Sequence, residues 1–116
     1  MRFAVLGSGS QGNGTLIASD STYVLVDCGF SLRETERRLV RLGISPHQLS
    51  AILVTHEHAD HVHGVGLLSR RYNLPVYMSR GTQRGMRKPL EPAGYVAGGE
   101  TLQIGALSIS VTRVAH

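Results

Sequence analysis

The sequence predicts one mixed α/β domain, in which a group of antiparallel strands is followed by helices and strands in alternation. Short apolar runs rich in β-branched residues succeed one another near the N-terminus, and the tight loops between them favour antiparallel pairing. The hydrophobic period then changes to that of a helix, and afterwards alternates between helix and strand. A chain of 116 residues suffices for a single small domain over 1–116.

Local signals along the chain place the individual elements. Ser31 and Glu34 have the spacing of a helix capping box, and Gly43 is a typical helix stop. The continuous apolar run 51–54 predicts a strand buried on both faces. In order, we expect strands at 2–6, 15–18 and 22–26, a helix at 32–42, the strand at 51–54, a helix at 64–72, a strand at 75–78, a weaker helix at 82–88 and a final hairpin turning near Gly105.

Composition restricts the class of protein and its partners. Hydrophobic residues make up 41% of the chain and charged residues 17%, as in ordinary soluble globular proteins. The formal net charge of +4 fits an anionic partner such as nucleic acid, and it equally fits arginines scattered over a solvated surface. The lone Cys28 excludes an internal disulfide. No apolar run approaches the ~18 residues of a membrane span, so we expect a cytoplasmic protein without a membrane partner.

Four candidate metal ligands, His56, His58, Asp60 and His61, follow the buried strand at 51–54. Imidazole and carboxylate groups are ligands for zinc, manganese and iron. An extended segment can point His56 and His58 the same way, whereas Asp60 and His61 diverge unless the backbone turns sharply. Such a turn could give one pair to each of two ions ~3.5–4 Å apart, a common arrangement for hydrolysis. The cluster therefore predicts most of a two-metal hydrolase site.

Other interpretations of the histidines are weaker. His56 and Glu57 begin a zincin motif, but that motif needs a histidine where this chain has Asp60, so a zincin helix is excluded. His63 exceeds the number of ligands that the site needs, and we expect it to be an outer-shell or surface group. His47 follows a proline in a turn-like segment and is expected at the surface.

The glycine-rich loop 7–14 matches G-x-G-x-x-G directly after a strand. A dinucleotide site requires a helix next, because its N-terminus meets the pyrophosphate. Another apolar strand run follows instead, at 15–18, and the P-loop lysine is missing. The loop therefore does not predict NAD or ATP binding.

Segment 55–61, Thr-His-Glu-His-Ala-Asp-His, resembles the His-x-His-x-Asp-His signature of the metallo-β-lactamase-fold hydrolases. The upstream order is also similar: a strand ending in Asp27, a helix, and an apolar strand entering the motif. The resemblance implies an α/β (α+β) fold, with this chain as the N-terminal half of an αββα sandwich. That half is expected to hold a mostly antiparallel or mixed sheet with helices on one face. It would be a truncated domain, and its open sheet face would invite homo-oligomer formation.

The same resemblance implies a set of ligands. His56, His58 and His116 would hold the first ion, and Asp60 with His61 the second. Zinc is the expected ion, with manganese or iron as alternatives. Asp60 and His58 are the expected catalytic residues, and Asp60 is the ligand best placed to orient the attacking water.

Two carboxylates are expected around the ligands. By resemblance, Asp27 supports the metal loop through hydrogen bonds. Ligating histidines usually donate their other ring proton to a carboxylate or a carbonyl, and Asp27 and Glu57 are the available candidates.

The glycine-rich loop, Ser-Gly-Ser-x-Gly-Asn, resembles the YycJ (WalJ) branch of the superfamily, whose members look like end-directed nucleases or phosphodiesterases. Ser8, Ser10 and Asn13 could donate hydrogen bonds to a substrate phosphate, or could only form a tight hairpin beside the site. We therefore expect a metal-dependent, exonuclease-like phosphodiesterase acting on nucleic acid. The alternatives are a hydrolase of a thioester, lactone or β-lactam, and a non-catalytic metal-binding half-domain.

Overall fold

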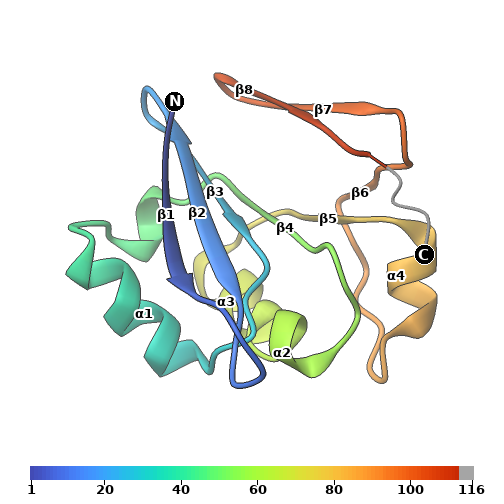
Figure 1. The fold of residues 1–116 in the computed structure, drawn as a ribbon, viewed down its shortest axis with the longest axis horizontal. Coiled ribbons are helices and arrows are strands. Elements are labelled where there is room, and N and C mark those ends of the chain that lie inside the picture. The colour runs from blue at the N-terminus through green and yellow to red at the C-terminus, as the bar shows by residue number, and fades with distance from the viewer. Residues whose placement is uncertain (113–116) are drawn as a thin grey trace.

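The fold, seen in a computed structural model that describes residues 1–112, is a six-stranded mixed sheet with helices beside it and a separate hairpin (Figure 1). The strands are β1 (Arg2–Gly7), β2 (Gly14–Ser19), β3 (Thr22–Val26), β4 (Ala51–Leu53), β5 (Val76–Met78), β6 (Gly94–Tyr95), β7 (Thr101–Ile104) and β8 (Leu107–Ser110). The helices are α1 (Leu32–Arg41), α2 (Ala59–Val62), α3 (Val65–Tyr72) and α4 (Arg80–Gly85), with a short 3₁₀ helix at Pro46–Gln48.

The sheet has an antiparallel part and a parallel part. Its strand order is β1-β2-β3-β4-β5-β6, antiparallel from β1 to β3 and parallel from β3 to β6. Parallel neighbours need crossover connections, and the segments carrying α1, α3 and α4 provide them. The carboxyl ends of β3, β4 and β5 therefore meet at one edge of the sheet, where α/β proteins place their sites. The predicted fold class is confirmed.

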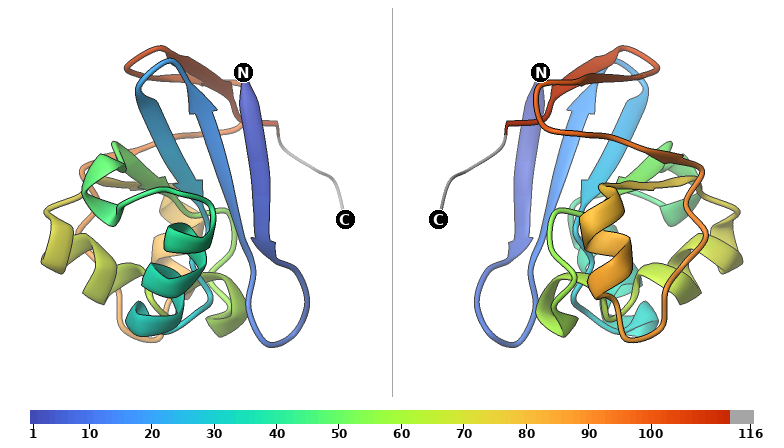
Figure 2. Two further views of the ribbon diagram at one scale, coloured as in Figure 1. Left: turned by 90° about the vertical axis from the view of Figure 1, so that its left-hand side faces the viewer. Right: turned by 90° about the vertical axis from the view of Figure 1, so that its right-hand side faces the viewer.

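The main core lies between the sheet and the helices. Leu25 and Ile52 of the sheet pack in one cluster with Leu39 of α1, Leu68 of α3 and Met78 of β5, and all five are fully buried. Helices on one face of the sheet are the arrangement that the family resemblance implied. Figure 2 shows helices α1 to α4 together on the helical side of the sheet, away from the β7–β8 hairpin.

The opposite face of the sheet is covered only in part. Val24 and Leu53 pack there against Ile104 and Leu107 of the β7–β8 hairpin. Strand β4 is consequently buried on both faces, as predicted. Farther along the same face, Phe3 and Val5 of β1 are 73% and 58% exposed.

Helix α1 differs in detail from its predicted form. The Ser31 hydroxyl accepts a hydrogen bond from the Glu34 N–H (3.2 Å), as an N-cap does. The Glu34 carboxylate does not complete the capping box; it forms ion pairs with Arg37 (3.0 Å) and Arg38 (2.8 Å) instead. Leu42 is 42% exposed, because the helix ends at Arg41 and Leu42 is its C-cap.

Some of the remaining elements were predicted with small shifts, and others were not predicted. The weaker helix lies at Arg80–Gly85 and begins two residues earlier than expected, because Ser79 caps it by accepting from the Thr82 N–H. The two-residue strand β6 and the single turn α2 were not predicted. His47 lies exposed in the 3₁₀ helix, as expected.

The glycines of the 7–14 loop make room for a core side chain, Phe30. A Cβ atom at Gly7 would lie 2.5 Å from the Phe30 Cζ, and one at Gly12 would lie 2.5 Å from its Cε1. The guanidinium of Arg38 covers the ring, 4.1 Å from its centroid, and also donates to the Leu6 carbonyl. The G-x-G-x-x-G pattern therefore has a packing role here, consistent with a chain that continues into a strand.

Two further features bear on the sequence-based expectations. Within residues 1–112, no helix is long and apolar enough to cross a membrane. Cys28 is a free, buried cysteine, and burial raises the pKa of its thiol.

Candidate metal centre

The centre forms where the ends of β3 and β4 lie side by side. Asp27 directly follows β3, and its N–H donates to the Leu53 carbonyl of β4 (2.8 Å). Its backbone has a φ of 64°, a left-handed conformation that is uncommon outside glycine. Such unusual conformations cluster at functional sites, because the surrounding structure must stabilise them. The conformation ends the strand and leaves Asp27 beside the metal loop.

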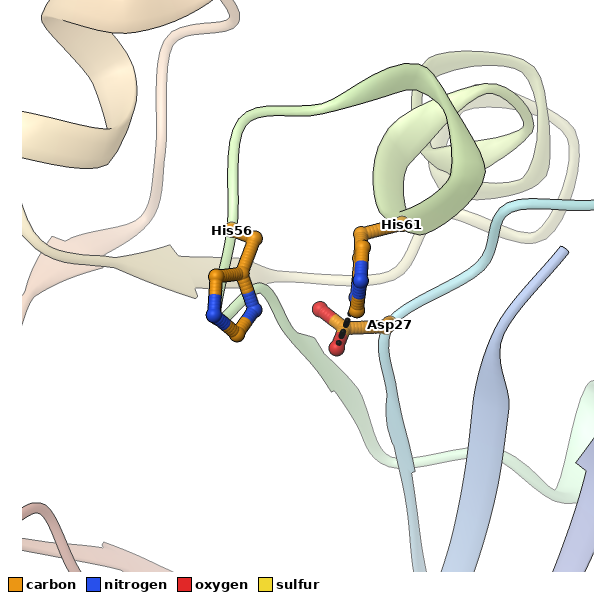
Figure 3. Close-up of side chains that lie close together, drawn as sticks. All are labelled: Asp27, His56 and His61. Carbon is orange, nitrogen blue, oxygen red and sulfur yellow. Dashed lines mark hydrogen bonds and ion pairs between the residues drawn. The ribbon is translucent and has the colours of Figure 1, made fainter. Parts of the chain in front are cut away.

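The Asp27 carboxylate is buried, with 6% of the residue exposed, and it accepts three hydrogen bonds. Its Oδ1 accepts from the Thr55 N–H (2.7 Å), and its Oδ2 accepts from the Thr55 hydroxyl (2.5 Å). Oδ2 also contacts His61 Nδ1 at 2.9 Å (Figure 3). An ionised carboxylate can only accept, so a neutral His61 ring carries its proton on Nδ1. The lone pair of His61 Nε2 is then available to a metal ion.

Thr55 determines which ring nitrogen of His56 carries the proton. The Thr55 hydroxyl has one proton, which it donates to Asp27. Its 2.8 Å contact with His56 Nδ1 therefore requires the ring nitrogen to donate. The lone pair of His56 is consequently on Nε2, as on His61, and the two ring centroids lie 4.6 Å apart. One carboxylate thus sets the tautomer of both imidazoles, directly for one and through Thr55 for the other.

The donor set fits a divalent ion. Asp27, His56 and His61 each bring one atom that is able to bind a metal to within 4.8 Å of the others (Figure 3). The Asp27 oxygens already accept from Thr55 and His61, so Asp27 holds the two imidazoles in place. Asp60 Oδ2 lies 3.6 Å from His61 Nε2, the nitrogen that carries the lone pair when the ring is neutral. Zinc–nitrogen and zinc–oxygen distances of about 2.0–2.2 Å allow two ligands this far apart to share one ion. A cation between them would remove the repulsion of the two lone pairs.

The sharp backbone turn that Asp60 and His61 would need is present as the single turn of α2. His58 is its N-cap, and the His58 carbonyl accepts from the N–H groups of His61 (2.8 Å) and Val62 (3.1 Å). The His58 side chain is exposed and is not in the group of three described above. His63, at the end of this turn, is exposed as expected.

Two of the predicted residues lie away from this group or outside the description. Glu57 packs against α4, where a Cβ on Gly85 would lie 2.8 Å from the Glu57 Cγ. Within residues 1–112 it accepts no hydrogen bond from a histidine, so the outer-shell carboxylate of the described site is Asp27. His116 lies outside the described residues.

Backbone hydrogen bonds join three separate segments around α2. The Asn13 N–H donates to the Asp60 carbonyl (2.7 Å), and the Gly29 N–H donates to the Asn13 carbonyl (2.9 Å). The Cys28 N–H donates to the His61 carbonyl (2.8 Å). A Cβ on Gly29 would overlap the Asp60 carbonyl oxygen, so only glycine allows this approach.

The residues expected at a substrate phosphate have different surroundings. Ser8 and Ser10 are exposed, and their hydroxyls have no hydrogen-bond partner in the described part of the chain. The Asn13 amide nitrogen donates to the Gly9 carbonyl (2.8 Å) and contacts two oxygens of Asp60. Thr55, Gly29 and the contact of Asn13 with Asp60 were not predicted from the sequence, although Thr55 directly precedes the histidines.

A model of the metallo-beta-lactamase superfamily matches residues 7–111. The chain belongs to this superfamily. Among curated relatives, the exodeoxyribonuclease YycJ of Bacillus anthracis is 35% identical over 121 residues, which cover all of this chain and 46% of that protein. The exodeoxyribonuclease WalJ of Streptococcus pneumoniae is 39% identical over 85 residues, covering 73% of this chain and 32% of that protein. The predicted family and branch are confirmed.

A third relative and two solved structures complete the comparison. The ribonuclease TTHA0252 of Thermus thermophilus is 31% identical, over all of this chain and 33% of that protein. A B3 metallo-beta-lactamase with an active-site glutamic acid superposes with a TM-score of 0.77 at 25% identity, over 93% of this chain and 47% of the other. MEM-A1, a subclass B3 metallo-beta-lactamase from a soil metagenome library, superposes with a TM-score of 0.71 at 26% identity. The match covers 91% of this chain and 47% of MEM-A1. The chain thus spans less than half the length of these superfamily members, whose names are those of hydrolases.

Proposed function

We propose that the chain forms the metal-binding part of a phosphodiesterase that cleaves nucleic acid, with exonuclease-like activity. The observation that carries the proposal is the pair of imidazoles whose tautomers Asp27 sets, beside the Asp60 carboxylate. Histidine and carboxylate ligands of this kind build two-metal hydrolase sites. The names of the curated relatives support nucleic acid as the substrate class.

In this proposal His56, His58 and His116 hold one ion, and Asp60 with His61 hold the other. When bound, the two divalent ions supply Lewis acidity toward phosphate oxygens and make water acidic enough to attack near neutral pH. Zinc is the ion we propose, with manganese or iron as alternatives. Asp60 would orient the attacking water by accepting a hydrogen bond from it at a carboxylate oxygen. Asp27 and Thr55 keep the Nε2 atoms of His56 and His61 unprotonated.

A cationic surface beside the metal loop supports a nucleic-acid substrate. Residues 61–90 contain no aspartate or glutamate. This surface is made of four exposed residues of α4 and the loop after it, which form no ion pair within residues 1–112: Arg80, Arg84, Arg87 and Lys88. Gly85, in the middle of this surface, packs against Glu57 of the metal loop. Unpaired cations at this place would attract a phosphate backbone without reading its sequence.

Removing two cations of this surface is expected to weaken the binding of single-stranded DNA. For Arg84→Ala with Arg87→Ala, the slope of log K against log salt should fall by about 1.4, because each phosphate contact to a single strand contributes about 0.7. Fluorescence anisotropy of a labelled oligonucleotide, with EDTA present to prevent cleavage, measures this slope. The control is Arg33→Ala with Arg37→Ala on α1, at the other end of the molecule, which changes the net charge equally (Figure 1). An equal loss in both double variants would contradict a localised surface.

The proposed activity is tested by the choice of substrate. We expect a metal-loaded protein that contains the complete domain to hydrolyse bis-p-nitrophenyl phosphate or single-stranded DNA, and EDTA or His58→Ala to abolish the reaction. The structural likeness to B3 metallo-beta-lactamases favours β-lactam hydrolysis as the second candidate. Turnover of nitrocefin or of a thioester without phosphodiester turnover would replace our proposal by that one. Metal binding with no turnover of any of these would favour a non-catalytic half-domain.

Two other expectations stay predictions. A cytoplasmic location fits the nuclease names of the relatives. A homo-oligomer would cover the exposed Phe3 and Val5 on the open face of the sheet.

A further inference from the structure

We propose that Asn13 is a positioning residue that fixes the carboxylate of Asp60 toward the metal site. The inference rests on the metal site of the proposed function, and it gives the glycine-rich loop a role in that site. Asn13 lies 47 residues before Asp60 in the chain, yet its side-chain nitrogen contacts Asp60 Oδ2 (3.0 Å) and the Asp60 carbonyl (3.1 Å). The backbone N–H of Asn13 also donates to that carbonyl (2.7 Å).

The hydrogen bonds of the Asn13 side chain determine its orientation. Its Nδ2 donates to the Gly9 carbonyl (2.8 Å), and its Oδ1 accepts from the Gly9 N–H (3.1 Å). In the flipped orientation the amide oxygen would face the Gly9 carbonyl and the Asp60 carboxylate. All three groups only accept hydrogen bonds, so none could form there. Gly9 has a φ of 136°, a conformation that favours glycine, so the loop closes on the side chain of Asn13.

The protons of this amide are all used inside the protein. Nδ2 carries two protons: one goes to Gly9, and the other is shared between the two oxygens of Asp60. None remains for a substrate phosphate, which distinguishes Asn13 from the exposed hydroxyls of Ser8 and Ser10 in the same loop.

The effect on Asp60 is a restraint on its side chain. The Oδ2 that accepts from Asn13 is the oxygen that lies 3.6 Å from His61 Nε2. Without the amide, the half-buried carboxylate would be free to rotate into solvent and away from His61. Residues that hold ligands in this way typically change metal affinity by about 10- to 100-fold when they are removed.

The test is a Zn²⁺ titration of the chain in competition with a chromophoric chelator. We expect Asn13→Leu, which keeps the size of the side chain, and Asn13→Ala to lower Zn²⁺ affinity by about 10-fold or more. Gln11→Ala, an exposed neighbour in the same loop, should leave the affinity unchanged. Two variants are used because the isosteric one introduces an apolar group. An affinity within about 2-fold of the parent in both would overturn the proposal, since it would fall outside the range for outer-shell groups.

A double-mutant cycle separates positioning from a general effect on folding. In an Asp60→Ala background the carboxylate is gone, so Asn13→Ala should lower Zn²⁺ affinity no further. An equal loss in both backgrounds would show that Asn13 acts on the loop and not on Asp60, and would overturn the proposal. The titration uses no nucleic acid, so a failure of the proposed phosphodiesterase activity would leave its outcome unaffected.

Discussion

Asp27→Asn is expected to lower the affinity of the chain for Zn²⁺ by about 10- to 100-fold, although Asp27 is not among the proposed ligands. The carboxylate accepts from the Thr55 N–H, from the Thr55 hydroxyl and from His61 Nδ1. An amide in its place keeps one acceptor and gains two donors. When the new N–H faces His61 Nδ1, that nitrogen must accept, and the ring proton moves to Nε2. The substitution therefore occupies the atom that the metal ion needs.

The change at Asp27 also reaches His56. With an N–H group in place of the acceptor Oδ2, the Thr55 hydroxyl is free to donate to His56 Nδ1, which places the proton of that ring on Nε2 as well. Both imidazoles would then have to change tautomer before binding, and each change costs free energy. We expect the lower affinity to appear as a larger Zn²⁺ dissociation constant, with the number of bound ions unchanged.

The chain offers a matched control in Asp20, in the turn between β2 and β3. Asp20 and Asp27 are both aspartates with a positive φ, of 54° and 64°, a conformation that asparagine also tolerates. Asp20→Asn makes the same change of charge far from the histidines and should not alter Zn²⁺ affinity. If Asp27→Asn bound Zn²⁺ as tightly as Asp20→Asn, the tautomer argument would be wrong.

Gly29→Ala is expected to destabilise the fold by about 3 kcal/mol or more, the upper range for overpacking a tight interior. A Cβ at this position would overlap the carbonyl oxygen of Asp60 and lie 2.9 Å from the Asn13 nitrogen. Both obstacles are backbone atoms, and they belong to two segments that hydrogen bond to each other. The clash can be relieved only by moving α2 away from β3, which separates Asp60 and His61 from Asp27.

Urea or thermal unfolding measures this effect, with Gly81→Ala in α4 as the control. A Cβ on Gly81 meets nothing closer than 3.9 Å, and its φ is ordinary. Alanine there should raise stability by up to about 1 kcal/mol, because it is the better helix former. The close approach of the backbones would be refuted by a Gly29→Ala variant within about 0.5 kcal/mol of the parent, the range typical of harmless surface changes.

The sequence predicted the features of this molecule that depend on short stretches of chain. The strand at Thr22–Val26 and the N-cap at Ser31 depend on neighbouring residues, and so does the ligand cluster that follows β4. Strand β6 was missed because two residues are too few to show a hydrophobic period. The turn of α2 was foreseen only as a requirement of the ligands, since Ala-Asp-His-Val has no helical pattern of its own.

The network around the ligands depends on contacts between distant segments. Thr55 and Asp27 are 28 residues apart, and Asn13 and Asp60 are 47 apart. A threonine before a histidine and an asparagine after a glycine carry no periodic or motif signal for such contacts. Their roles follow only from the strand order, which sets the ends of β3 and β4 beside the loop between β1 and β2.

The packing of Phe30 against the glycine-rich loop has a consequence for how this family varies. The ring occupies the space that side chains at positions 7 and 12 would need. Substitutions at these three positions should therefore be coupled through evolution: relatives with an aromatic residue at 30 should keep both glycines, and relatives with a small residue there should be free to lose them. Covariation alone would then show that this loop, although it matches a nucleotide-binding pattern, packs around an aromatic ring.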